Sequence, residues 1–293
     1  MTMRKFLVTL AAVLCCAMTA FAQTDRNRTY RITLNNVQYA HHDEKMSAGD
    51  AVGKILTGAL TGQTSVQATE YEDDVKNAII KGLSGAHRFR YNDGLLNLDD
   101  IVEEGNLVVD AIITNIKANS SSRTWKDKDD KTQVSTTHTG VAEVMLTLKD
   151  AKTGEVMANP SFKGQGIAGS SYSTSDKAIQ EALSGLSNRI TVWLNNYRPL
   201  RANILEGGAA KKDKQKEVYI DLGSNEGAFV GLHMGVYEVK TIAGREAKSQ
   251  IGKLKIEAVE GDDISRCKVQ SGGKDIKAAL DAGQQLQVIS IDK

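Results

Sequence analysis

The sequence predicts an α+β protein in which a two-layer α/β sandwich, built on a mixed sheet, is followed by a small β-barrel. Three observations carry this prediction. Residues 107–116 are almost continuously apolar, as a buried central strand requires. Residues 176–197 carry an apolar stripe at helical spacing that ends just before Pro199, which predicts a long C-terminal helix for the sandwich. Residues 217–293 contain short apolar runs separated by glycines, which favours a small barrel.

The amino terminus has the pattern of a secretory signal, so the mature chain is expected to begin at Gln23. Arg4 and Lys5 precede an apolar stretch, and Ala22 closes a cleavage site of small residues. The stretch is too short for a membrane-spanning helix, which needs roughly 20 apolar residues. The expected organisation is a signal peptide at 1–22, a sandwich at 23–203, a linker at 204–216 and a barrel at 217–293.

The cysteines bear on the location of the protein. Cys15 lies inside the signal and follows Leu14, where a lipid-attachment motif would place glycine or alanine, so cleavage without lipidation is expected. Removal of the signal leaves Cys267 as the last cysteine, which excludes an internal disulfide and lies on an alternating strand pattern typical of a core residue. The expected location is the periplasm, free or peripheral to the outer membrane, with a lipid-anchored or an extracellular protein as the alternatives.

The elements of the sandwich follow from periodicity. Residues 30–35 alternate apolar and polar side chains, which predicts a half-buried strand. Residues 71–83 repeat apolar side chains at helical spacing behind a group of acidic residues, which favour a helix amino terminus. The further expected elements are a short strand at Phe89 and Tyr91, the central strand at 107–116, a strand at 144–148, a turn at 150–155, a return strand at Val156 and Met157, and the helix with its stripe of Ile179, Leu183, Leu186, Ile190, Trp193 and Tyr197.

Two polar stretches interrupt this pattern. Residues 119–139 are nearly free of large apolar side chains apart from Trp125 and Val134, which predicts a long exposed hairpin or a flexible loop. In residues 206–216, glycines and alanines are followed by lysines without apolar periodicity, which predicts a solvated linker. The candidate partner contacts in the exposed loops are Trp125, Lys126, Lys128 and Tyr172.

Two resemblances to known families follow from these segments. The apolar strand at 107–116, the Asp-Ala-Lys-Thr-Gly-Glu-Val turn at 150–156 and the long helix resemble the curli secretion channel (CsgG-like) family and the related periplasmic domain of lipoprotein activators of penicillin-binding proteins. The strands at 218–239 and 251–256 resemble the C-terminal SH3-like domain of the flagellar H-ring protein FlgT. The first resemblance covers about residues 30–197, and together they imply a self-associating envelope-assembly protein.

The resemblance to the channel family does not extend to its pore. Barrel hairpins that cross a membrane alternate apolar residues toward the lipid. The corresponding stretches here, residues 123–139 and 162–175, are charged or rich in glycine and serine. The sequence therefore argues against a pore.

Several short stretches match motifs for cofactor or metal binding by letter, but the surrounding sequence lacks the structure that each motif requires. Gly164, Gly166 and Gly169 match the dinucleotide fingerprint by letter, but no helix opens at the third glycine, so a flexible loop is expected. Residues 41–44 hold two histidines that would point to opposite faces of a strand, without further ligands to complete a metal site. Residues 126–131 lack the spacing of a calcium-binding EF-hand loop. We expect no catalytic residue, no cofactor and no bound metal.

Charge and composition narrow the class of function. The chain has 37 lysines and arginines against 36 aspartates and glutamates, which gives no reason to expect nucleic acid as a partner. We therefore expect a non-enzymatic secreted cell-envelope protein of a Gram-negative bacterium, a scaffold or assembly factor for a secretion or surface structure at the outer membrane. The alternative is a soluble periplasmic regulatory module, such as an activator of a cell-wall synthase. Envelope proteins or a second copy are the expected partners, with at most peripheral membrane association and no small-molecule substrate.

Overall fold

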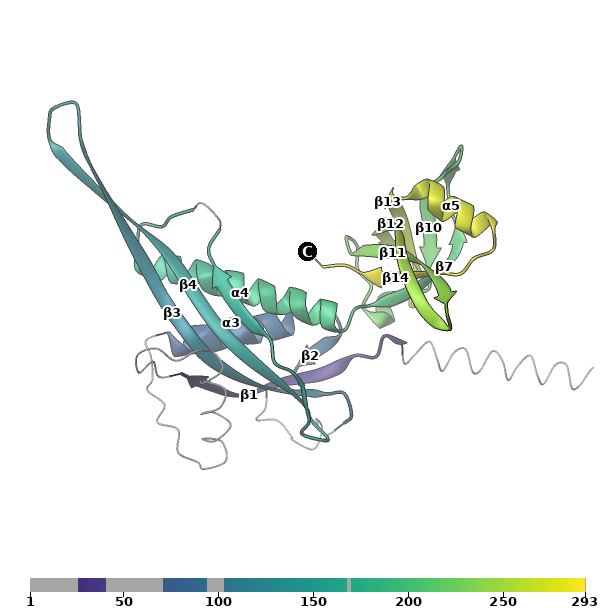
Figure 1. The fold of residues 1–293 in the computed structure, drawn as a ribbon, viewed down its shortest axis with the longest axis horizontal. Coiled ribbons are helices and arrows are strands. Elements are labelled where there is room, and N and C mark those ends of the chain that lie inside the picture. The colour runs from purple at the N-terminus through teal and green to yellow at the C-terminus, as the bar shows by residue number, and fades with distance from the viewer. Residues whose placement is uncertain (1–25, 41–70, 94–102, 168–169, 293) are drawn as a thin grey trace, which may run out of the picture. The chain divides into compact units, whose positions relative to one another are not determined.

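The computed structural model describes residues 26–40, 71–93, 103–167 and 170–292, and the chain divides into two compact units (Figure 1). Among the described residues, one unit begins at Tyr30 and ends at Trp193, and the other comprises residues 194–292 together with residues 26–29. The α+β class is confirmed, because the first unit combines a mixed sheet with helices and the second closes into a barrel. The predicted cleavage site at Ala22 and Gln23 and the histidine pair in residues 41–44 lie outside the described residues.

The sheet of the first unit has the order β2-β1-β3-β4-β5, and β6 also pairs with β4. Strand β1 is parallel to both β2 and β3, whereas β4 is antiparallel to β3, β5 and β6, so the sheet is mixed as predicted. The bounds are β1 Tyr30–Tyr39, β2 Phe89–Tyr91, β3 Leu107–Lys126, β4 Thr132–Asp150, β5 Val156–Ala158 and β6 Ser161–Gln165.

The core of this unit lies between the sheet and the helices α3 (Glu72–Ser84) and α4 (Ser175–Tyr197). Alternate residues of β3 and β4 are buried, and the first four members of the predicted helical stripe, from Ile179 to Ile190, are buried as well. Helices α3 and α4 lie side by side in Figure 1, and a Cβ atom added at Gly82 of α3 would lie 2.8 Å from the Cβ of Ile190 in α4. Burial of these aliphatic side chains supplies the main driving force for the unit.

Two glycines let α4 approach the sheet at backbone distance. A Cβ atom at Gly140 of β4 would lie 2.0 Å from the carbonyl oxygen of Ala178, and one at Gly164 of β6 would lie 2.1 Å from that of Ala182. The expectation of a flexible loop at Gly164 was therefore wrong, because this glycine belongs to a paired strand under a helix. Glycine is needed there for close packing, which the letter pattern alone did not reveal.

The second unit is a barrel of six strands that closes in the order β10-β13-β12-β11-β14-β7. Its core is aliphatic and includes Val218, Met234, Leu254 and Val288. Closure pairs both edges of every barrel strand, which removes open edges. The bounds are β7 Arg201–Gly207, β8 Ala210–Lys211, β9 Lys214–Gln215, β10 Glu217–Ile220, η2 Ser224–Glu226, β11 His233–Ile242, β12 Arg245–Val259, β13 Ser265–Ser271, α5 Gly273–Asp281 and β14 Leu286–Ser290.

The predicted linker at 204–216 was wrong, because this segment is part of the barrel. Strand β7 pairs antiparallel with β10, with Ile204 opposite Ile220, and the small hairpin β8–β9 connects the two strands. Gln215 is 5% exposed, and its side-chain amide donates hydrogen bonds to the carbonyl oxygens of Gly208 at 3.0 Å and Glu217 at 2.7 Å. Backbone pairing needs no apolar side chain, so a segment of small residues and lysines can fold into strands.

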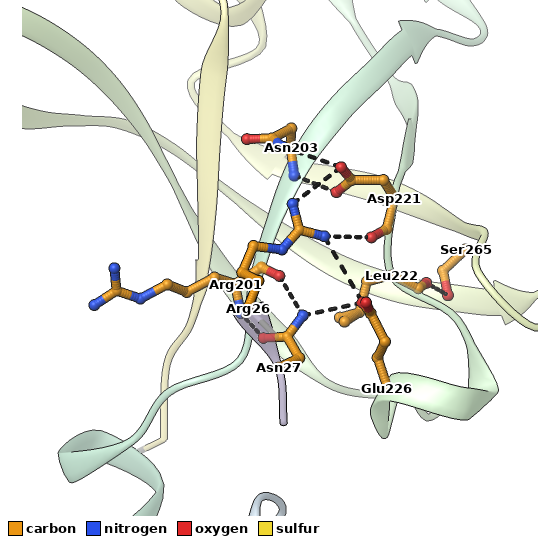
Figure 2. Close-up of polar contacts among 8 residues, drawn as sticks. All are labelled: Arg26, Asn27, Arg201, Asn203, Asp221, Leu222, Glu226 and Ser265. Carbon is orange, nitrogen blue, oxygen red and sulfur yellow. Dashed lines mark hydrogen bonds and ion pairs between the residues drawn. The ribbon is translucent and has the colours of Figure 1, made fainter. Parts of the chain in front are cut away.

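The amino-terminal residues Arg26 and Asn27 bind the barrel, as Figure 2 shows. The Arg26 guanidinium donates to the Asp221 carboxylate at 3.0 Å and to the Asp221 carbonyl oxygen at 2.8 Å. The Asn27 side chain donates to Glu226 at 3.0 Å and accepts from the Arg201 backbone N–H at 2.8 Å. The barrel is therefore completed by residues from the opposite end of the chain, and we call this set of contacts the amino-terminal clamp.

Cys267 lies in the barrel core with no exposed surface, as its strand pattern predicted. Burial, and to a smaller extent the charge of Glu257, raises the pKa of its thiol to about 12. The thiolate is the reactive form of cysteine, so the native thiol is expected to be inert.

We expect iodoacetamide at pH 8 to leave Cys267 unmodified in the native mature chain and to alkylate it in urea. Because Cys15 and Cys16 leave with the predicted signal, intact mass reports this thiol alone. Free glutathione in the same tube controls for reagent activity. Labelling of the native protein at the rate of glutathione would contradict the buried placement.

The turn after β4 is organised by the carboxylate of Asp150, which is 5% exposed. Its Oδ1 accepts the backbone N–H groups of Lys152 and Thr153, both at 2.9 Å, and its Oδ2 accepts that of Gly105 at 2.8 Å. The donors at Thr153 and then Gly105 lower the pKa of Asp150 below its usual range. The predicted turn at 150–155 thus owes its stability to an ionised side chain.

Asp150→Asn is expected to destabilise the first unit by about 2 kcal/mol at pH 7, because the neutral amide cannot accept all of these N–H groups. The folded pKa lies below the unfolded value, so the stabilisation is fully present above about pH 4 and is lost as pH falls through the folded pKa. Urea midpoints followed by tryptophan fluorescence should differ between variant and wild type at pH 7, and the difference should shrink as the pH falls below about 4. A difference in urea midpoint that is the same at every pH would contradict the role of the ionised Asp150 carboxylate.

Candidate interaction surface

Strands β3 and β4 continue beyond the helices as a two-stranded ribbon, which we define as residues 118–140. Helix α4 begins at Ser175, and its first turns meet β4 at Gly140. From there the pairing runs through nine residue pairs, from Ala118 opposite Gly140 to Lys126 opposite Thr132. At roughly 3.4 Å per residue the ribbon is about 30 Å long. Figure 1 shows it projecting past α3 and α4.

The ribbon is held by backbone pairing and by polar side chains across the strands. The Ser122 and Thr136 hydroxyls lie 2.9 Å apart, and the Ser120 hydroxyl lies 2.9 Å from Nδ1 of His138. Threonine favours extended backbone, and cross-strand hydroxyl pairs add a small stabilisation. Of the two structures predicted for residues 119–139, the structure therefore has the hairpin.

The tip of the ribbon is an ordered turn closed by Asp127. One carboxylate oxygen accepts the backbone N–H groups of Asp129 and Lys131 at 2.9 Å, and the other accepts the Gln133 side chain at 2.8 Å. The hydrogen bond from Gln133, followed by that from Lys131, lowers the pKa of Asp127. This carboxylate is therefore occupied in closing the turn.

The ribbon exposes one large apolar side chain on each face. Trp125 is 44% exposed, and Val134, which follows on the opposite strand and the opposite face, is 63% exposed. The Trp125 face is hollowed into a shallow groove of about 560 Å³. The groove is lined by Ser121, Arg123, Trp125, Ser135 and Thr137.

The structure groups three of the four predicted contact residues. Trp125, Lys126 and Lys128 lie at the tip of the ribbon, where Lys126 pairs with Asp130 at 2.8 Å. Tyr172 does not join them, because it pairs with His138 at the base of the ribbon. Its hydroxyl is buried, so the side chain presents little to a partner at the tip.

The other groove residues, Ser121, Arg123, Ser135 and Thr137, were not among the contact residues predicted from the sequence. Arg123 lies two residues before Trp125 on the same strand, and Ser135 lies opposite Arg123. Alternate residues of a strand share a face, so the hairpin register would have placed these side chains together. The spacing of two between these residues is visible in the sequence, but it indicates a shared face only if residues 119–139 are paired strands, which the structure shows.

The part of the chain that the structure describes contains no group of three or more histidine, cysteine, aspartate or glutamate side chains that could hold a metal ion. Two of the described histidines have side-chain partners: Nδ1 of His138 lies 2.9 Å from the Ser120 hydroxyl, and Nδ1 of His233 lies 3.1 Å from the Gln270 side-chain oxygen. None of the helices in the described ranges is both long and apolar enough to cross a membrane.

The fold and its surface define an α+β protein with a closed six-stranded barrel and a projecting β-ribbon. No family model and no curated protein matches the sequence. Among solved structures, a PelC dodecamer from Paraburkholderia phytofirmans is similar at 8% identity and a TM-score of 0.31, covering 56% of this chain and 86% of that one. Protein XCC0632 from Xanthomonas campestris, of the DUF330 family, is similar at 10% identity and a TM-score of 0.31, covering 57% and 84%.

A third similar structure is lipoprotein GNA1162 from Neisseria meningitidis, at 12% identity and a TM-score of 0.20, covering 55% of this chain and 97% of that one. TM-scores this low carry no argument about function. The function of this chain is therefore inferred from its own sequence and geometry.

Proposed function

We propose that this protein is a non-enzymatic scaffold or assembly factor of the cell envelope that binds a protein partner through the β-ribbon. The observation that carries the proposal is the ribbon itself. It continues for eight residue pairs beyond Gly140, where β4 meets α4, and exposes an aromatic side chain near its tip. The secretory pattern of residues 1–22 supports an envelope location.

The energetics of the ribbon favour a binding role. Ordering each residue costs about 1–2 kcal/mol of conformational entropy, which burial of apolar surface normally offsets. A two-stranded hairpin without a packed face is marginally stable in water. Apart from Trp125 and Val134, the outer ribbon offers mainly hydroxyl, amide and charged side chains. A partner that covers the ribbon would supply the missing burial, so the element is suited to contact another protein.

Site-specific photo-crosslinking in intact cells tests this function. A photo-reactive phenylalanine at Trp125 is expected to give one discrete crosslinked product containing an envelope protein. The matched control replaces Ile242, an apolar side chain that is 62% exposed at the end of β11 in the barrel. Like Trp125, Ile242 is an exposed apolar side chain near the turn of a β-hairpin, but that hairpin belongs to the barrel and not to the ribbon.

The products distinguish the candidate functions. A specific adduct from position 125 that is absent from position 242 supports the scaffold, and an adduct with a second copy would make self-association its mechanism. Equal adducts from both positions, or none from position 125, would contradict a binding role for the ribbon. The soluble regulatory module would then be the better account.

A further inference from the structure

We propose that the outer edge of β3 binds an acidic, extended segment of the partner protein by strand addition. The inference rests on the proposed function and deepens it by naming the chemistry of the partner. The carrying observation is an edge of β3 that no strand among the described residues covers and whose residues carry positive but no negative side chains.

The edge begins where β1 leaves the sheet. Strand β1 pairs with β3 as far as Tyr39 opposite Ile113, and the β3–β4 register shifts between Ile113 and Asn115. From Asn115 to Lys126, twelve residues, no strand in the described part of the chain lies along this side of β3. An open edge presents alternate backbone N–H and C=O groups that an extended peptide can pair with.

The corresponding edge of β4 is shorter. Strand β6 pairs with β4 up to Gln165 opposite Val141, and Tyr172 adds a further bridge at His138. Among the described residues, only 132–137 remain open on that side. The longer open edge, and so the larger number of backbone hydrogen bonds, belongs to β3.

The charges along β3 favour an added strand with acidic side chains. Between Asn115 and Lys126 the strand carries Lys117, Arg123 and Lys126 and no carboxylate. Lys126 already pairs with Asp130, whereas Arg123 has no ion-pair partner among the described residues. Two copies of this edge would bring like charges together, which opposes self-pairing, whereas acidic side chains on an added strand would be attracted.

The groove adds a preference for side chains. Trp125 and Arg123 are two residues apart on one face of β3, and both line the groove. Side chains of an added strand alternate in the same way, so every second residue would lie beside this face. An apolar residue beside Trp125 and an acidic residue beside Arg123 would satisfy both. The fitting segment therefore carries an acidic residue and an apolar or β-branched residue two positions apart, so that both lie on the groove face.

The alternative explanation is that these positive side chains only prevent the open edge from pairing with other strands, which would lead to aggregation. The two explanations predict different behaviour toward peptides. An edge that is only protected repels or ignores every added strand, whereas a binding edge selects one by its charge.

Three synthetic 12-residue peptides separate these cases on the full mature chain. Each repeats two valines followed by two copies of a variable residue, which is glutamate, glutamine or lysine, so that valine and the variable residue alternate along each face. We expect the glutamate peptide to bind, to change the fluorescence of Trp125 and to slow hydrogen exchange within residues 115–126 but not 132–137. A Trp125→Phe variant assigns the fluorescence change. Binding should weaken with rising salt because the charges are exposed.

A matched pair of variants tests the charge. Lys117→Gln with Arg123→Gln is expected to weaken binding of the glutamate peptide about fivefold, as the loss of two exposed charge pairs predicts. Lys248→Gln with Lys253→Gln removes the same net charge from β12 of the barrel and should have no effect. The inference is overturned if the glutamate and glutamine peptides bind equally, if none binds, or if protection appears on β4. Crosslinks from position 125 that persist in that case would leave the scaffold function standing with another kind of partner.

Discussion

Asp221→Ala is expected to destabilise the barrel by about 3 kcal/mol, because it removes one partner of a largely buried ion pair and the acceptor of several hydrogen bonds. Asp221 is 7% exposed, and its carboxylate accepts hydrogen bonds from Arg26 and from the backbone and side chain of Asn203 (Figure 2). After the substitution the Arg26 guanidinium stays largely buried without its carboxylate. The remaining acid nearby is Glu226, at 3.7 Å from the guanidinium.

Cys267 reports this change without interference from the other unit. Its thiol reacts only when the barrel opens, so in urea below the unfolding midpoint its labelling rate follows the opening equilibrium. A loss of 3 kcal/mol corresponds to labelling about 100-fold faster. Asp281→Ala is the matched control, since the Asp281 side chain is 62% exposed and its i,i+4 pair with Lys277 is worth about 0.5 kcal/mol or less.

A double-mutant cycle with Arg26→Ala tests the clamp as a unit. If Arg26 and Asp221 act on each other, the double variant should lose much less stability than the sum of the single variants. Additive losses would contradict the contact. The cycle also checks that residues just after the predicted cleavage site belong to the barrel, which the structure shows at a sequence separation of 195.

Gly164→Ala is expected to destabilise the first unit by about 3 kcal/mol, because the added methyl group overpacks the contact between α4 and β6. Its Cβ atom would lie 2.1 Å from the carbonyl oxygen of Ala182 and 2.6 Å from the Cβ of Leu186. The backbone of Ala182 cannot rotate away as a flexible side chain can. The helix must shift, and every contact of its buried stripe loosens with it.

Tryptophan fluorescence in a Trp125→Phe background reports this shift, because Trp193 of α4 packs edge to face on Phe162 of β6 at 6.0 Å between ring centroids. The matched control is Gly154→Ala. Gly154 has a positive φ of 72° but no atom within 4 Å of an added Cβ, so only backbone strain of about 1 kcal/mol is expected. Equal losses at both glycines would contradict the steric explanation.

Much of the first unit could be predicted because its elements leave a periodic signal. The buried side of α3, the alternation in β1 and the apolar run of β3 each record which side chains face a core. The turn at 150–155 was readable for a different reason, since an aspartate and a glycine at fixed positions satisfy a local backbone geometry. In these cases the signal and the structure it determines lie within a few residues of each other.

The candidate site was predicted only in part. Trp125 was identified because a large aromatic stands out in a polar stretch, but its groove depends on which residues pair across the ribbon. Tyr172 was grouped with it on the same ground, and the structure separates them because chain pairing places Tyr172 at the ribbon base. The composition of a stretch shows that a residue is unusual there, but the register of the paired strands determines which side chains lie next to it.

The sequence by itself therefore determined the α+β class, the identity of most elements and the buried position of Cys267, since each of these follows from local spacing of apolar and polar residues. Only the tertiary structure decided that residues 204–216 are strands and a hairpin rather than a linker, and that Arg26 and Asn27 complete the barrel. The physical reason is that backbone hydrogen bonds and a buried ion pair join residues far apart in the chain. Every residue except proline carries a backbone N–H and C=O group, and every arginine or aspartate carries a charge. Contacts between such groups therefore leave no periodic pattern from which a sequence could predict them.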